Sequence, residues 1–111
     1  VGSRCCVVAA GAIAARDRER VLSSLAAAER HVEIIDGLQM AGFAGNVLEL
    51  RAADSGRMLA MSAAAHAAFG PAAIARLAST VNRMVVAPIP TIETLGGGSV
   101  RCMLAEVFLP Y

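Results

Sequence analysis

The sequence is poor in aromatic side chains and has little net charge. It contains no tryptophan, one tyrosine and three phenylalanines among 111 residues, and its formal net charge is +1. No run of basic or acidic residues stands out. A surface that binds nucleic acid needs clustered basic residues together with rings that stack on bases. We therefore expect no nucleic-acid partner.

Long apolar runs and a disulfide framework are also lacking. No apolar stretch reaches the ~18 residues that a membrane span requires, so we expect no membrane partner. Residues 1–15 superficially resemble a signal peptide, but the β-branched pair Val7-Val8 and the central Gly11 favour a buried strand and a turn. Three cysteines, two of them adjacent, do not form a disulfide framework. These features favour a reducing, cytoplasmic location.

Apolar residues are in excess, at 57% of the chain, against about 45–50% in ordinary globular proteins. Either the chain buries surface against another partner, or it is one segment of a larger core. The first residue is Val1 rather than Met, which fits both a start codon other than ATG and a truncated sequence.

One structural unit occurs twice along the chain. The first copy, residues 1–36, begins with a predicted strand over Cys5–Ala9. A helix follows, with Asp17 as its predicted N-cap, and a strand over His31–Ile35 closes the unit. The three-four spacing of a buried helix stripe is met by Val21, Leu22, Leu25 and Ala28. This copy reads β-α-β.

The second copy, residues 45–88, begins with a hairpin. Its strands are predicted over Asn46–Arg51 and Met58–Met61, and the turn Asp54–Arg57 between them has suitable turn chemistry.

A helix in two pieces follows this hairpin. Ser62 is its predicted cap, Gly70-Pro71 interrupts it, and a strand over Arg83–Ala87 ends the copy before Pro88 and Pro90. The face of the second piece that points inward is predicted to consist of Ile74, Leu77, Ala78 and Val81. This copy reads β-β-α-β.

Equivalent strands of the two copies lie about fifty residues apart, at the upper end of the ~20–50-residue period of propellers and solenoids. Units of this kind are stabilised by their neighbours. The sequence therefore predicts an α/β fold that forms part of a longer repeat protein, which would also explain the apolar excess.

The segment with the clearest chemical signal is Gly96–Leu109. Three consecutive glycines precede Ser99, Arg101 and Cys102, and we predict that the segment is a strand. Glycines leave room for a ligand, and a nearby guanidinium favours thiolate over thiol. Cys102 is therefore a candidate nucleophile, although a free cysteine is more often a small buried hydrophobe. For Cys5 and Cys6 we predict that second role.

Other polar residues give weaker signals. Asn46 either caps a turn or faces a pocket, and Glu49 is expected to face solvent on an amphipathic strand. His31 and His66 have no partner at metal-ligand spacing and are expected to be structural, so we predict no metal site. Strand alternation would place Glu106 on the same face as Cys102. The glycines match neither a dinucleotide-binding nor a P-loop fingerprint, and we expect no cofactor.

With these motifs, nearly the whole chain resembles the superfamily of enzymes that modify guanidino groups. This superfamily includes arginine deiminases, dimethylarginine dimethylaminohydrolases and glycine amidinotransferases. The chain is most similar to the bacterial arginine-deiminase-related branch of amidinotransferases and citrulline-utilisation hydrolases. The segments that carry the resemblance are Phe43–Leu50, Leu59–Ser62, Pro90–Glu93 and Gly96–Leu109.

The resemblance implies a five-bladed α/β propeller of the pentein type, built from ββαβ modules around a central active site. The chain would supply about two blades: residues 1–36 as a partial blade, 45–88 as a full one, and 96–109 as a terminal strand. It implies that Cys102 attacks the guanidino or ureido carbon of an arginine-like substrate and forms a covalent thiouronium-type intermediate. The candidate substrate-binding residues are Asn46, Gly97, Gly98, Ser99 and Arg101.

The family's general-base histidine belongs to a motif of the His-Thr-Asn-Val type, which would lie before Val1. Neither His31 nor His66 falls on its position. We therefore expect the chain alone to be inactive and to need the missing amino-terminal blades or self-association. The alternative is a non-catalytic remnant or interaction module that associates with an amino-terminal partner. A small oligomeric binding domain unrelated to this chemistry would require the glycine–cysteine segment to be a coincidence.

Overall fold

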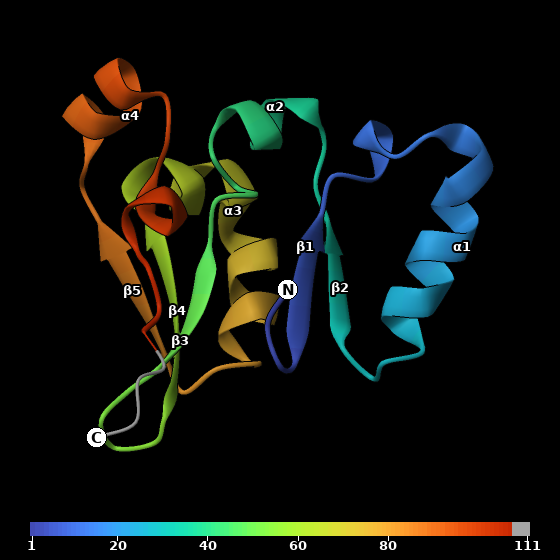
Figure 1. Cartoon of the computed structure of the whole chain (residues 1–111), viewed down its shortest axis with the longest axis horizontal. Coiled ribbons are helices and arrows are strands. Elements are labelled where there is room, and N and C mark those ends of the chain that lie inside the picture. Colours follow the sequence, from blue (N-terminus) through green and yellow to red (C-terminus); the bar gives the residue numbers. More distant parts are fainter. Residues whose placement is uncertain (108–111) are drawn as a thin grey trace.

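Two small β-sheets form the framework of the protein in a computed structural model, which describes residues 1–107 (Figure 1). The first sheet consists of β1 (Cys5–Val8) and β2 (His31–Ile34), which are parallel. In the second sheet, β4 (Arg57–Ser62) lies between the antiparallel β3 (Leu48–Arg51) and the parallel β5 (Arg83–Ala87). The predicted α/β class is confirmed.

Each sheet contains one parallel pair of strands joined by a helix, α1 (Ala15–Ala26) in the first and α3 (Ala63–Ala78) in the second. In the first pair Cys5 lies opposite His31, and in the second Met58 lies opposite Arg83. The two pairings therefore span nearly the same length of chain. Apart from the predicted terminal strand, the strands lie in the predicted order, with bounds that differ from the predicted ones by at most two residues.

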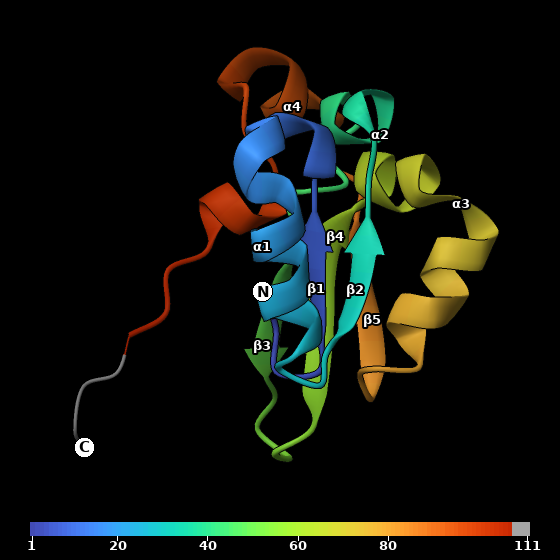
Figure 2. The ribbon, with the colours of Figure 1, turned by 90° about the vertical axis from the view of Figure 1, so that its right-hand side faces the viewer.

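The core lies around α3, which contacts β4 and β5 of the second sheet and β2 of the first, and which lies to one side of both sheets (Figure 2). Helix α1 covers the opposite side of the β1–β2 pair (Figure 2). The buried cluster consists of Cys5, Ile35, Ala44, Leu59, Met61, Ala65, Phe69, Ala73 and Leu77. Cys5 and Cys6 are both buried, as predicted. Within residues 1–107, every helix is too short or too polar to cross a bilayer.

Helix α3 has the predicted start and the predicted interruption. The Ser62 hydroxyl accepts a hydrogen bond from the Ala65 N–H at 3.0 Å. Gly70 has φ 74° and ψ 165°, a conformation that glycine adopts far more easily than other residues, and Pro71 begins the second piece. Of the predicted inner face, Leu77 is fully buried and Ile74 and Val81 are half-buried, whereas Ala78 is exposed, so its prediction is wrong.

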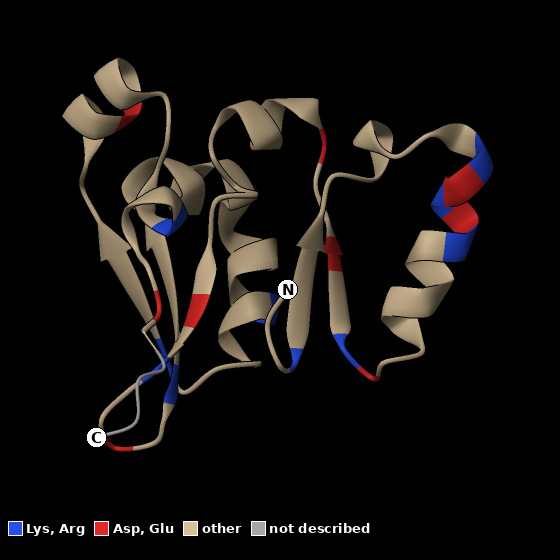
Figure 3. Ribbon diagram, in the orientation of Figure 1, with Lys and Arg blue, Asp and Glu red and all other residues tan. Residues whose placement is uncertain are grey.

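The predicted N-cap of α1 is wrong. The helix begins at Ala15, its N-cap is Ala14, and Asp17 lies inside the first turn, where it pairs with Arg20 at 3.1 Å. A carboxylate in the first turn interacts favourably with the helix dipole, so Asp17 still suits this position. Charges of both signs alternate along the start of this helix (Figure 3).

Within residues 1–99, three short helices have no counterpart among the predicted elements. The 3-10 turn η1 (Ala10–Ala12) follows β1, α2 (Gly37–Ala41) follows β2, and α4 (Pro90–Gly96) follows β5. Strand β5 ends at Ala87, directly before Pro88, as predicted, and Pro90 begins α4, where its missing N–H costs nothing.

The predicted terminal strand over residues 96–109 is wrong. Gly96 ends α4, Val100–Met103 form a 3-10 helix, η2, and residues 104–107 have no regular structure. The N–H groups of Cys102 and Leu104 donate to the nearby carbonyls of Ser99 and Arg101, so this backbone is bonded locally instead of to a neighbouring strand. Phe108 and Leu109, which the predicted strand included, lie outside the described residues.

Candidate functional site

Cys102 lies in η2, directly after a sharp turn that the glycines make possible. Gly97, at the end of α4, has φ 68°, in the left-handed region that glycine occupies without strain. The chain then reverses through Gly98 and Ser99 into η2. The thiol of Cys102 is exposed, in contrast to those of Cys5 and Cys6. The glycine triplet therefore serves a turn, and a short helix presents the sulfur atom.

Gly98 lies against the cysteine itself. A Cβ atom placed on Gly98 would lie 3.1 Å from the Cβ of Cys102 and 3.3 Å from its Sγ. Both distances are tighter than ordinary van der Waals contact. A side chain at this position would therefore displace or cover the thiol.

Asn46 connects the loop before β3 to this turn. Its Oδ1 accepts a hydrogen bond from the Arg101 N–H at 2.8 Å, and its Nδ2 donates to the Sγ of Cys102 at 3.0 Å. Asn46 lies 56 positions before Cys102 in the sequence, and only the fold brings the two together. The sequence interpretation left open whether Asn46 caps a turn or faces a pocket. Its side chain bonds to the turn, and the residue also lines the cleft described below.

These contacts lower the pKa of the Cys102 thiol. The hydrogen bond from the Asn46 side chain contributes most, followed by a backbone hydrogen bond from Ser99 and by the positive charge of Arg101. Partial desolvation opposes them. Hydrogen bonds to the charged form and a nearby cation favour ionisation. The site therefore favours the thiolate, the nucleophilic form of cysteine.

The other predicted site residues have different surroundings. Ser99 is fully buried, and its hydroxyl donates to Glu93 at 2.7 Å, so its side chain braces the turn against α4. Gly97 and Asn46 both line an open cleft of about 470 Å³. The remaining lining residues come from the ends of β1 and β2 and from the α2 region: Val7, Ala9, Ile35, Met40, Phe43 and Gly45. A cleft of this size suits a small molecule.

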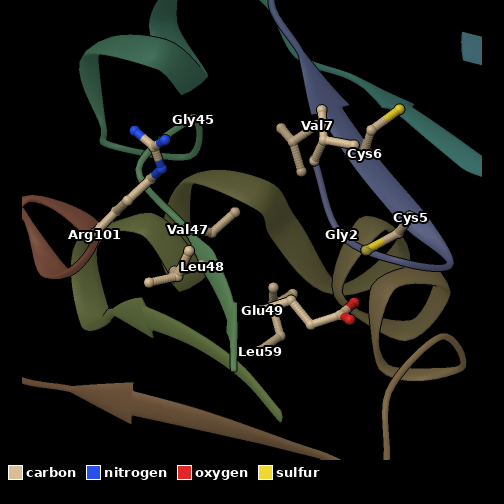
Figure 4. Close-up of a pocket in the computed structure, with 11 residues that line it drawn as sticks. Gly2, Cys5, Cys6, Val7, Gly45, Val47, Leu48, Glu49, Leu59 and Arg101 are labelled. Carbon is tan, nitrogen blue, oxygen red and sulfur yellow. The ribbon is translucent and has the colours of Figure 1, made fainter. Parts of the chain in front are cut away.

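A smaller hollow of about 160 Å³ shares Val7 and Gly45 with this cleft, and Glu49 and Arg101 are among the residues that line it (Figure 4). Glu49 accepts hydrogen bonds from the N–H of Ser3 at 3.1 Å and from its hydroxyl at 2.5 Å. The sequence pattern indicated only a carboxylate facing solvent, because nothing in it connects Ser3 with residue 49. Glu49 also lines a second hollow, together with Ser3, Arg51, Arg57 and Glu106.

Neither histidine belongs to the surroundings of Cys102. The His31 ring is bonded to Glu33 at 2.8 Å, and His66 lies on α3. In the described part of the chain, the side chain bonded to the thiol is that of Asn46. Residues 1–107 also contain no group of three histidine, cysteine, aspartate or glutamate side chains placed to hold a metal ion.

Fold and site together define a class: an α/β protein of repeated strand–helix–strand units that presents an exposed cysteine in a setting that favours its thiolate. Residues 1–109 match the family model described as N,N dimethylarginine dimethylhydrolase, eukaryotic. The chain therefore belongs to the N,N-dimethylarginine dimethylhydrolase family, and the predicted membership of the guanidino-group-modifying superfamily is confirmed. No curated protein and no solved structure matches the chain.

Proposed function

We propose that this chain supplies the nucleophile and part of the substrate site of an enzyme that hydrolyses guanidino or ureido groups of arginine-like substrates. One observation carries the proposal: in a chain of this family, Cys102 is exposed and its thiolate is favoured by Asn46. The cleft lined by Asn46 and Gly97 is the proposed place for the substrate, because Asn46 connects it to the thiol of Cys102, which is not itself one of the lining residues.

In the proposed reaction the thiolate of Cys102 adds to the planar carbon of the substrate and forms a C–S bond. A C–N bond then breaks, and the nitrogen leaves as ammonia or an amine after it takes up a proton. Water adds to the resulting thiouronium-type carbon, the C–S bond breaks and the thiolate is regenerated. In an amidinotransferase, an acceptor amine would take the place of water.

We propose further that the proton-transferring base comes from outside this chain, since His31 is bonded to Glu33 and His66 lies on α3. In this proposal residues 1–36 and 45–88 are two of the five blades of a pentein-type propeller, and the chain acts in the cytoplasm. Alone it would be inactive and would need further blades or self-association. We propose no cofactor and no nucleic-acid or membrane partner.

An assay of ammonia and amine release from arginine, citrulline and methylated arginines tests the proposal. We expect no turnover by the 111-residue chain alone, and turnover when a segment carrying the base is joined to it. Cys102→Ala should abolish that turnover, whereas Met103→Ala, a change at the next exposed residue, should leave most of it. Turnover that survives Cys102→Ala would contradict the role of Cys102 as the nucleophile. Turnover by the chain alone would contradict the proposal that the base comes from outside it.

The alternative of a non-catalytic interaction module is favoured by a different observation. An apolar groove of about 280 Å³ lies between the β3–β5 sheet and η2, lined by Leu50, Met58, Ala60, Val85, Ala87, Ile89, Val100, Met103 and Leu104. Exposed apolar grooves are typical of surfaces that bind other proteins. A module of this kind would bind a partner protein but would release no ammonia, either alone or when a segment carrying the base is joined to it.

A further inference from the structure

We propose that Asn46 is a positioning residue for Cys102: its side-chain amide fixes η2 and orients the sulfur atom, instead of binding the substrate. The catalytic meaning of this inference rests on the proposed function. The geometry behind it concerns the thiol alone and is testable without any substrate.

The orientation of the Asn46 amide is determined by its partners. The Arg101 N–H can only donate, so the atom that faces it at 2.8 Å must be the oxygen Oδ1. The NH₂ group then necessarily faces Sγ of Cys102 at 3.0 Å. A group that can only donate interacts better with a thiolate than with a thiol. The backbone N–H of Arg101 therefore determines that Cys102 meets the NH₂ group of Asn46 and not its oxygen.

Asn46 is itself held in place by the chain around it. Its N–H donates to the Phe43 carbonyl at 2.8 Å, and Phe43 has φ 66°, so the turn before β3 is tight. Two residues later Leu48 pairs with Ala60 in the sheet. With one lone pair of Oδ1 and one N–H engaged, half of the hydrogen-bonding capacity of the Asn46 amide is already used by η2. This arrangement suits an anchor better than a substrate-reading group.

Few charged groups surround the thiol. Arg101, on η2 itself, contributes a positive charge. From α4, Glu93 accepts the hydrogen bond of the Ser99 hydroxyl. Strand β4 packs against η2 and contributes the apolar residues Met58 and Ala60 to the groove between them. Asn46 is therefore the group whose replacement should change the ionisation of Cys102 most directly.

The test is the rate at which iodoacetamide alkylates Cys102 in the 111-residue chain, measured by peptide mass spectrometry as a function of pH. Asn46→Asp retains an oxygen for the Arg101 N–H but replaces the NH₂ donor with a charged acceptor. We expect the midpoint of the profile to move to higher pH and alkylation at neutral pH to become several-fold slower. Asn46→Ala should shift the profile in the same direction by a smaller amount.

Asn82→Asp is the matched control. The Oδ1 of Asn82 also accepts a backbone N–H, that of Arg57 at 2.8 Å, so this variant adds the same charge to a similar bond elsewhere. Its profile should coincide with that of the unmodified chain. Alkylation of the buried Cys5 and Cys6 in each sample reports loss of the fold.

Three results would overturn the inference. An Asn46→Asp profile that coincides with that of the unmodified chain would show that Asn46 only supports the backbone. An equal shift in Asn82→Asp would show a general effect of charge. If both Asn46 variants expose Cys5 and Cys6, the residue serves the fold as a whole. None of these results bears on whether Cys102→Ala abolishes turnover, so this inference and the proposed function can fail separately.

Discussion

The absence of a side chain at Gly98 leaves room for the candidate nucleophile. The atoms that a new Cβ would approach, Cβ and Sγ of Cys102 at 3.1 and 3.3 Å, belong to a residue whose backbone is bonded to Ser99. The cysteine can move away only if η2 moves as well. This is a different requirement from that at Gly97, where the positive φ of the backbone favours glycine.

Gly98→Ala should therefore reduce the reactivity of Cys102 without unfolding the chain. We expect several-fold slower alkylation of this thiol at neutral pH, because the new methyl group crowds Sγ. Gly96→Ala is the control, since its Cβ would meet only Ile92 at 3.8 Å, an ordinary contact at the end of α4. Equal alkylation rates for Gly98→Ala and the unmodified chain would show that the turn adapts to a side chain at this position.

At the residue scale, the sequence indicates which residues belong to the site better than it indicates which residues they contact. It singled out Cys102 and Asn46, and the structure places them in contact. The contact itself could not be predicted, because no spacing rule connects residues so far apart in the chain. The buried hydrogen bond from Ser99 to Glu93 was missed for another reason. Because three glycines precede Ser99, the sequence suggested that this residue is open and faces a ligand.

At the scale of secondary-structure elements, Asp36 caps α2, whereas Asp17 lies inside the first turn of α1. Asp36 and Gln39 form a reciprocal capping box at α2: the Gln39 N–H donates to Asp36 at 2.8 Å, and the Asp36 N–H donates to the Gln39 side chain at 3.0 Å. Gln39 also donates to the Ala68 carbonyl of α3 at 3.2 Å. A helix of five residues is too short to be stable alone, so these bonds keep one wall of the cleft in place.

Asp36→Ala should lower the free energy of unfolding by about 1 kcal/mol, the usual effect of losing an N-cap. Asp17→Ala should cost less, roughly 0.3–1 kcal/mol, because this residue pairs with Arg20 and the helix dipole but caps nothing. Urea denaturation of both variants and the unmodified chain measures the difference. A larger loss in Asp17→Ala would contradict the assignment of Ala14 as the N-cap of α1.

The order of the longer elements could be predicted because each has a strong local signal, such as the interruption of α3 at Gly70-Pro71. The strand predicted over residues 96–109 failed because an apolar run after glycines fits a strand and a turn equally well. Whether such a run forms a strand or a turn depends on which acceptors bond to its backbone N–H groups. The N–H of Arg101 finds its acceptor on the Asn46 side chain, and that bond is a product of the tertiary fold.

At the scale of the whole molecule, one ion-pair network connects the two repeats. Glu33 on β2 is only 5% exposed, and both of its carboxylate oxygens accept hydrogen bonds from Arg76 on α3, at 2.7 and 3.0 Å. His31 bonds to the same carboxylate at 2.8 Å. The contact therefore connects the first sheet, through β2, with α3 of the second repeat. It therefore contributes to how the two walls of the cleft are placed relative to each other.

This network predicts how stability depends on pH. The hydrogen bonds from Arg76 are the main reason that the pKa of Glu33 is lowered, burial opposes them, and His31 adds to the lowering. A carboxyl group whose pKa is lower in the folded chain stabilises the fold above its ordinary pKa of about 4.3. That contribution is lost as the pH falls through the lowered value, because the proton then binds more readily to the unfolded chain.

The free energy of unfolding should therefore decrease as the pH falls below about 4.3, and part of this decrease should be absent in Glu33→Gln. At neutral pH Glu33→Gln should be less stable than the unmodified chain, because Arg76 loses its charged partner, and the two stabilities should converge in acid. Glu19→Gln, a change on the mixed-charge face of α1, is the control and should retain the full dependence. Urea denaturation at a series of pH values measures this. Parallel curves for Glu33→Gln and the unmodified chain would show that Glu33 does not link the repeats energetically, whatever its geometry.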